Sequence, residues 1–206
     1  MSNSENEQEG LPLRLYRCAE SEEYAKRVMA TQDLQFSIRC LVKLRELNKG
    51  KCEDDLVKEA LWNSAIIRAY SIFDGNSSIK KDILDKLPEG AREAYNFFRN
   101  YRRTHIAHRV NPVDQVKAGV ILSDKRSDKK EVLGVGNLAM SDASYADSEF
   151  VDSLGRFLDS LAKQIAIEGK ESEEKMLEKA KADDIEQLYS LKTLRVVIPS
   201  GAHLHK

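Results

Sequence analysis

The sequence from Pro88 to Pro112, PEGAREAYNFFRNYRRTHIAHRVNP, predicts a helix over about residues 89–109. Proline suits the first turn of a helix, where its missing N–H would have no partner. Asn111 precedes Pro112, and a residue before proline is pushed away from helical backbone angles. We therefore expect the helix to end just before Asn111, with the sequence YRRTHIAHR in its last turns.

Those last turns concentrate basic side chains. Four arginines and two histidines lie among residues 99–109 with no acidic residue, although the net charge of the chain is only −1. Arginine keeps its charge, and its planar fork of donors matches phosphate oxygens. Histidine can accept or donate a proton near neutral pH. The two residue types together indicate chemistry on a phosphodiester.

The composition predicts a soluble, mainly helical protein. The chain has 206 residues, of which 33% are charged and 41% hydrophobic, with ten glycines and four prolines. This length suffices for one substantial domain, and the scarcity of glycine and proline favours long helices. Because the charges nearly balance, the protein is not expected to coat nucleic acid non-specifically, so any contact with RNA must be local.

The cysteines and the chain start indicate a cytoplasmic protein. Three widely spaced cysteines without a CxxC pair are typical of a reduced chain rather than of a disulfide framework or a zinc module. No apolar run approaches the roughly 20 residues that span a bilayer. Residues 1–10 are acidic and polar, unlike a signal peptide. We expect no membrane contact.

Apolar spacings of three and four predict further helices on both sides of the basic segment. These are expected at residues 20–48, 53–73, 79–87, from 147 onward, and 185–191. The predicted fold class is all-α, a bundle of four to five main helices. Its expected extent is residues 19–192, with a disordered tail over residues 1–18 and a C-terminal tail over residues 193–206. Aromatic residues expected in the core are Trp62, Tyr70, Phe97 and Phe98.

One segment departs from the helical pattern. Val116–Leu122 and Val132–Leu138 are β-branched and contain glycine, and a polar stretch separates them. This pattern predicts a small β-hairpin, inserted at about residues 115–140.

The spacing within the basic segment limits how its side chains can cooperate. On a straight α-helix, Arg102 and His108 would lie about 120° and about 9 Å apart, on different faces. A site that uses both requires a helix end that turns His108 back, or a second chain that supplies a matching set. His108 lies near the helix end, where the helix dipole favours imidazolium and where a histidine can act as a general base or acid.

Other interpretations of the same residues remain open. Four arginines on a helix often form only a solvated face, or pair with an acidic face of a second copy such as residues 171–178. Two histidines three residues apart could bind zinc, but no cysteine or carboxylate stands at ligand spacing, so no metal site is expected.

The segment Tyr101–Arg109 resembles the R-x(4–6)-H signature of HEPN domains, with Arg102 and His108 as its ends. The Ile-Ala-His ending, the preceding helix LWNSAIIRAYSIFD at residues 61–74 and the hairpin after the motif resemble the abortive-infection subgroup in particular. The resemblance covers about residues 20–170.

The resemblance implies a helical bundle that dimerises and a metal-independent ribonuclease without a cofactor, of the toxin–antitoxin or phage-defence type. It implies RNA as the substrate and an antitoxin protein as a possible partner. By analogy, His108 would activate a ribose 2′-hydroxyl and Arg102 would stabilise charge on the phosphate. Supporting or RNA-binding residues would be Arg99, Asn100, Arg103, His105 and Arg109.

Two alternatives accompany this assignment. The family often has Asn, Asp or His directly after the arginine, where this chain has Arg103. The overlapping frame of Arg99, Asn100 and His105 restores the asparagine and keeps the spacing. The second alternative is a non-catalytic HEPN-like helical module that binds RNA or a partner protein through the same basic face.

Overall fold

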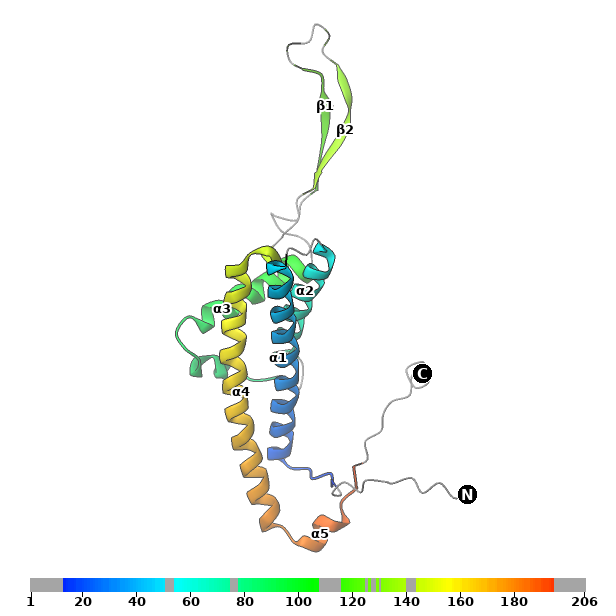
Figure 1. Ribbon diagram of the computed structural model, residues 1–206. Helices are drawn as coiled ribbons and strands as arrows, with labels where there is room; N and C mark the ends of the chain where they lie inside the picture. Colours follow the sequence, from blue (N-terminus) through cyan, green and yellow to red (C-terminus); the bar gives the residue numbers. More distant parts are fainter. Residues whose placement is uncertain are drawn as a thin grey trace, which may run out of the picture. The chain divides into compact units, whose positions relative to one another are not determined.

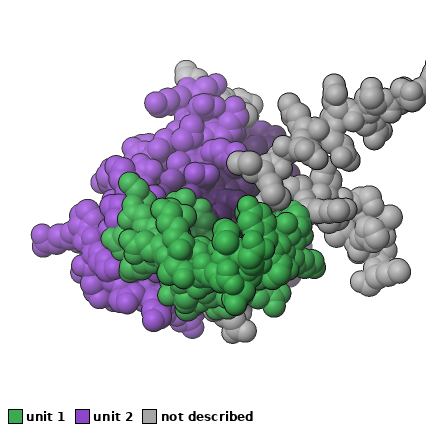
Figure 2. All heavy atoms as spheres, turned by 90° about the horizontal axis from the view of Figure 1, so that it is seen from below, with its two compact units in different colours: residues 1–25, 168–206 green, residues 26–167 purple. Residues whose placement is uncertain are grey.

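The computed structural model describes residues 13–50, 54–74, 78–107, 116–124, 126, 129, 131–139 and 144–194. Most of these residues are helical, and the strands among them form one two-stranded antiparallel sheet (Figure 1). The predicted all-α fold with a β-hairpin is confirmed at this level. The chain divides into two compact units, Lys26–Ile167 and Met1–Ala25 with Glu168–Lys206, which Figure 2 distinguishes by colour.

Four long helices make up most of the structure. They are α1 (Ala19–Lys49), α2 (Asp55–Ser71), α3 (Ala91–Tyr101) and α4 (Ser148–Ala182). Asp54 caps α2, since its side chain accepts a hydrogen bond from the Val57 amide at 3.1 Å. Gly169 lies within the continuous helix α4. Shorter helices are η1 (Lys81–Lys86), η3 (Ser144–Ala146) and α5 (Ile185–Ser190).

The predicted helix of residues 89–109 differs from the observed one at both ends. Gly90 has a positive φ of 84°, so α3 begins only at Ala91. After Tyr101 the chain continues as the π-helical segment η2, Arg102–Ala107. A π-helix closes i→i+5 hydrogen bonds, and it occurs mostly as single wide turns, frequently at functional sites. The residues after Ala107, up to 115, lie outside the described part of the chain.

The hydrophobic core lies within the unit Lys26–Ile167. Its fully buried large side chains come from α1, α2, α3, η1 and α4: Leu34, Leu41, Leu44, Trp62, Ile66, Tyr70, Ile83, Phe98, Leu154, Leu158, Leu161 and Ile165. Burial of each such side chain stabilises the fold by about 1.5–3 kcal/mol before entropy is counted. The predicted core positions of Trp62, Tyr70 and Phe98 are confirmed. The prediction that Phe97 lies in the core is wrong, since its side chain is 50% exposed, although its ring contacts those of Phe98 and Phe150.

Ion pairs join neighbouring helices of this unit at its surface. Arg45 on α1 contacts Asp152 on α4 at 2.6 Å, where the two helices run side by side (Figure 1). Gly155 leaves room for the Arg45 guanidinium, because a Cβ at this position would overlap it. Arg68 on α2 contacts Asp33 on α1 at 3.1 Å and lies over the Phe36 ring.

The hairpin consists of β1 (Val116–Leu122) and β2 (Val132–Ala139), in antiparallel register with Val120 opposite Val135. A β-bulge interrupts the register between Ile121 and Leu122. Apolar side chains of both strands are exposed: Val120, Ile121, Leu122, Val132, Leu133 and Val135. The predicted hairpin is confirmed.

The second unit joins the start of the described chain to its end. Leu15 donates its amide to the Lys192 carbonyl at 2.9 Å, and Arg14 forms an antiparallel bridge with Thr193. Arg14 and Leu15, within the expected tail of residues 1–18, thus pair with residues 192 and 193, and residues 1–12 lie outside the described part. Lys179 contacts Glu20 at 2.9 Å, which lowers the pKa of Glu20 to about 2.

The described helices include none that combines the length and the apolar character needed to cross a bilayer.

Candidate functional site

Helix α3 presents the candidate site because its two faces differ. Ala91, Tyr95, Phe98 and Tyr101 are buried at successive helical spacings and form the inner face. The outer face near its C-terminal end carries Arg99 and Asn100, both exposed. Arg103 is exposed in η2 directly after it. The same periodicity that attaches α3 to the core thus turns the basic residues outward.

The π-helical turn changes the geometry expected for the Arg/His motif. An angle of about 120° between positions 102 and 108 assumes a straight α-helix, whereas the backbone widens from Arg102 onward. Arg102 is the first residue of this turn. His108 and Arg109 lie outside the described residues, so the geometry of the Arg102/His108 pair stays a prediction.

A buried aromatic network fixes the point where α3 becomes η2. The Trp62 indole N–H donates to the Tyr101 hydroxyl at 2.9 Å, and both side chains are buried. Phe150 from α4 contacts both rings, at centroid distances of 5.9 Å. Tyr101 is therefore held from α2 and from α4, and the start of the π-helical turn is held with it.

His105, the histidine of the motif that the structure describes, contacts Tyr101 of this network. The His105 imidazole stacks on the Tyr101 ring, with centroids 4.5 Å apart and planes at 14°. His105 is half-buried. This stacking sets the plane of the imidazole. In the overlapping Arg99/His105 motif, the orientation of the histidine is therefore determined by the buried Tyr101.

Arg102 has a carboxylate partner that the sequence interpretation missed. Its Nη1 donates to Oδ2 of Asp74 at 2.7 Å, and the two side chains are 30% and 60% exposed. Asp74 directly follows the predicted helix of residues 53–73. No local sequence signal links it to Arg102, because 28 residues separate the two.

Arg99 and Arg102 lie close enough to two tyrosines to act on them electrostatically. Burial raises the pKa of Tyr70 and Tyr95, while the positive charges of Arg99 and Arg102 work in the opposite direction. The Tyr70 hydroxyl donates to the Tyr95 carbonyl at 2.9 Å and so ties α2 to α3. The buried pair of Tyr70 and Tyr95 thus lies near Arg99, Arg102 and Asp74.

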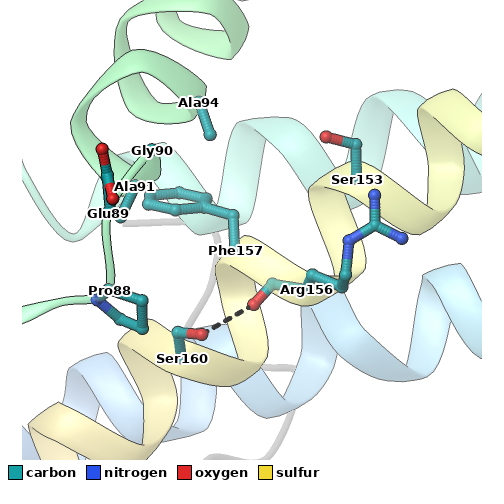
Figure 3. A pocket seen from close by; sticks show the side chains of 9 residues that line it. All are labelled: Pro88, Glu89, Gly90, Ala91, Ala94, Ser153, Arg156, Phe157 and Ser160. Carbon is teal, nitrogen blue, oxygen red and sulfur yellow. Dashed lines mark hydrogen bonds between the residues drawn. The ribbon is translucent and has the colours of Figure 1, made fainter.

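A separate cavity lies at the other end of α3. It has a volume of about 330 Å³ and is lined by Pro88, Glu89, Gly90, Ala91, Ala94, Ser153, Arg156, Phe157 and Ser160. The Phe157 ring points toward Ala91, and the Ser160 hydroxyl donates to the Arg156 carbonyl at 3.0 Å (Figure 3). None of the predicted site residues that the structure describes lines it.

Metal-binding side chains do not gather among the described residues. No group of three or more His, Cys, Asp or Glu side chains there is arranged to hold a metal ion. His203 and His205, in the C-terminal tail, lie outside the described part.

Comparison with family models, with curated proteins and with solved structures found no match to this chain.

Proposed function

We propose that this protein is a metal-independent endoribonuclease of the HEPN type, with its site at the end of α3 and in η2. The observation that carries the proposal is the position of Arg102. Arg102 directly follows the buried Tyr101 in the chain, its side chain is partly exposed, and its guanidinium contacts the Asp74 carboxylate at 2.7 Å. A cation held in place before the substrate arrives can stabilise charge that develops in a transition state.

The neighbouring residues suit a polyanionic substrate. Arg99 and Arg103 are exposed on either side of Arg102 in the sequence, and Asn100 is exposed beside them. Arginine donors recognise phosphate oxygens, and several such contacts position a nucleic acid backbone. We propose RNA as the substrate class, since the reaction below needs a 2′-hydroxyl.

The proposed reaction needs one base and one cation. His108 takes the proton of a ribose 2′-hydroxyl while its oxygen attacks the adjacent phosphorus. The bond between phosphorus and the 5′-oxygen breaks, and this oxygen takes up a proton from solvent. Arg102 stabilises negative charge on the non-bridging phosphate oxygens. The products are a 2′,3′-cyclic phosphate and a 5′-hydroxyl.

The resemblance adds three parts to the proposal. The chain acts as a homodimer, with the two Arg/His sets in one cleft. It acts in the cytoplasm in a toxin–antitoxin or phage-defence system. An antitoxin protein is the partner that restrains it.

The test is cleavage of total RNA by the purified full chain in EDTA. We expect wild-type protein to leave cyclic-phosphate ends, and Arg102→Ala or His108→Ala to lose at least about 100-fold in rate. Arg92→Ala is the matched control, because Arg92 is an α3 arginine that pairs with Asp85 outside the basic segment. It should cleave at the wild-type rate.

Each other outcome has its own meaning. Loss of activity in Arg99→Ala and His105→Ala, with full activity in Arg102→Ala and His108→Ala, would transfer the reaction to the overlapping frame. Tight RNA binding without any cleavage by the wild-type protein would replace the ribonuclease by a non-catalytic binding module.

A further inference from the structure

We propose that Asp74 is a positioning residue for Arg102, and that it determines where the guanidinium meets the RNA phosphate. This inference rests on the proposed function. The ion pair joins the turn after α2 to the first residue of η2, at an N–O distance of 2.7 Å. The backbone at Asp74 and the backbone at Arg102 are each held by neighbouring contacts.

The Asp74 side is anchored through its backbone neighbours. The Asp74 amide donates to the Ser71 carbonyl at 3.0 Å, which closes the turn after α2. The preceding residue, Phe73, is buried and packs edge-to-face on Tyr95 of α3 at 5.0 Å. The Asp74 carboxylate is therefore fixed relative to α3, the helix that leads to Arg102.

The Arg102 side is anchored through Tyr101. Tyr101 is buried and accepts the Trp62 hydrogen bond at 2.9 Å. Backbone motion at Arg102 is thus limited, but its long side chain can still rotate unless its tip is held. The Asp74 carboxylate holds the tip by accepting a hydrogen bond from Nη1. The guanidinium has further N–H donors, and these can bind phosphate oxygens.

Stability alone does not explain this pair. The two side chains are 60% and 30% exposed, and exposed ion pairs contribute little to folding. A carboxylate that contacts a basic segment also opposes RNA binding, because it repels phosphate. A residue that weakens substrate binding and adds little stability fits a role in orientation, where a small displacement of a group can cost about 100-fold in rate.

The experiment compares Asp74→Asn with Asp85→Asn in the full chain. Asp85 also pairs with an α3 arginine, Arg92, and lies outside the proposed site. For Asp74→Asn we expect kcat to fall about 10- to 100-fold. We expect the Kd for an RNA with 2′-deoxyribose at the cleavage position to be unchanged or lower, because a negative charge is removed. Asp85→Asn should leave both quantities unchanged.

Two further variants show whether Asp74 acts through Arg102. Asp74→Glu keeps the carboxylate and should recover part of the lost kcat. In an Arg102→Ala background, Asp74→Asn should cause no further loss, because the group that it orients is gone. Independent, multiplicative losses would overturn the positioning role.

The outcomes separate this inference from the proposed function. Active wild-type protein with equal kcat in Asp74→Asn and Asp85→Asn would overturn the positioning role alone. A wild-type chain that cleaves no RNA would overturn the ribonuclease and this role together. A parallel loss of kcat and RNA affinity in Asp74→Asn, with a lower melting temperature, would assign Asp74 to folding instead.

Discussion

Helix α3 and the β-hairpin both carry large apolar side chains, but the two regions use them differently. Phe98 of α3 is 1% exposed, whereas Val135 of the hairpin is 83% exposed. The helix places one face against α2 and α4, through contacts of Trp62 with Phe98 and of Phe98 with Phe150. The hairpin has its own ladder of hydrogen bonds and exposed side chains on its strands.

The comparison shows that packing, not hydrophobicity, determines which region can hold a site. A two-stranded hairpin alone is marginally stable in water, because neither face is covered. The end of α3, in contrast, is held by buried aromatic residues from two other helices. Side chains attached to α3 can therefore keep a defined position, as the proposed reaction requires.

The largest expected effect comes from removal of the buried aromatic residue of α3. Phe98→Ala leaves a cavity in the core and should lower the free energy of unfolding by about 3–5 kcal/mol. The neighbouring Phe97 is half-exposed, so Phe97→Ala is the matched control and should cost less than half as much. Urea unfolding followed by circular dichroism measures both. Equal costs would mean that α3 is not attached by the face described.

The second effect tests the hydrogen bond behind the site. Tyr101→Phe removes the hydroxyl that accepts the Trp62 indole N–H, and leaves that buried donor without this acceptor. We expect a loss of about 1–3 kcal/mol in unfolding free energy. A double-mutant cycle with Trp62→Phe should show a coupling energy between the two positions. Strictly additive losses would exclude an energetic role for this bond.

The third effect compares one substitution in both regions. A Cβ at Gly90 or at Gly134 would meet no atom within 4 Å, so alanine is not blocked sterically at either position. The two positions differ in their backbone conformation. Gly90 has a φ of 84° at the start of α3, where alanine is strained, and Gly90→Ala should cost about 1–2 kcal/mol. Gly134 in β2 has no positive φ, and Gly134→Ala should leave stability unchanged or raise it by about 0.5 kcal/mol. Thermal unfolding of both variants provides the comparison, and costs of the same sign and size would contradict it.

The smallest effect is expected from polar substitution in the hairpin. Val120 and Val135 are opposite each other and both exposed, so replacing both with threonine removes little buried area. The free energy of unfolding of the unit Lys26–Ile167 should change by less than about 0.5 kcal/mol. Urea unfolding monitored at the helical circular dichroism band measures it. A loss comparable with that of Phe98→Ala would show that the hairpin valines belong to the core.

Local sequence signals predicted much of the fold. The spacing of apolar residues located α1 and α2, and the structure shows Asp54 capping α2 close to its predicted start. The β-branched segments located β1 and β2. These features depend on neighbours within a few residues, so a single sequence contains the information for them.

The candidate site could be predicted only in part. Arg102 and His105 were identified from residue type and spacing, but Asp74 was not, because its contact with Arg102 depends on how α2 and α3 pack. The widened turn at Arg102 also escaped prediction, since hydrogen-bond register at a helix end responds to buried neighbours such as Tyr101. Phe97 was misassigned to the core because its residue type was weighed more than its position, which lies outside the series of buried positions 91, 95, 98 and 101.

The sequence by itself determined that the chain is mainly helical with one hairpin, and that its basic residues gather after Phe98. These properties follow from local backbone preferences and from the order of residue types along the chain. Only the tertiary structure decided that Asp74 meets Arg102, that His105 stacks on Tyr101, and that the hairpin valines stay exposed. The physical reason is that Asp74 and Arg102 are 28 residues apart, so packing between helices brings them together. The stacking of His105 and the exposure of the valines likewise depend on backbone geometry and packing that the order of residues alone does not give.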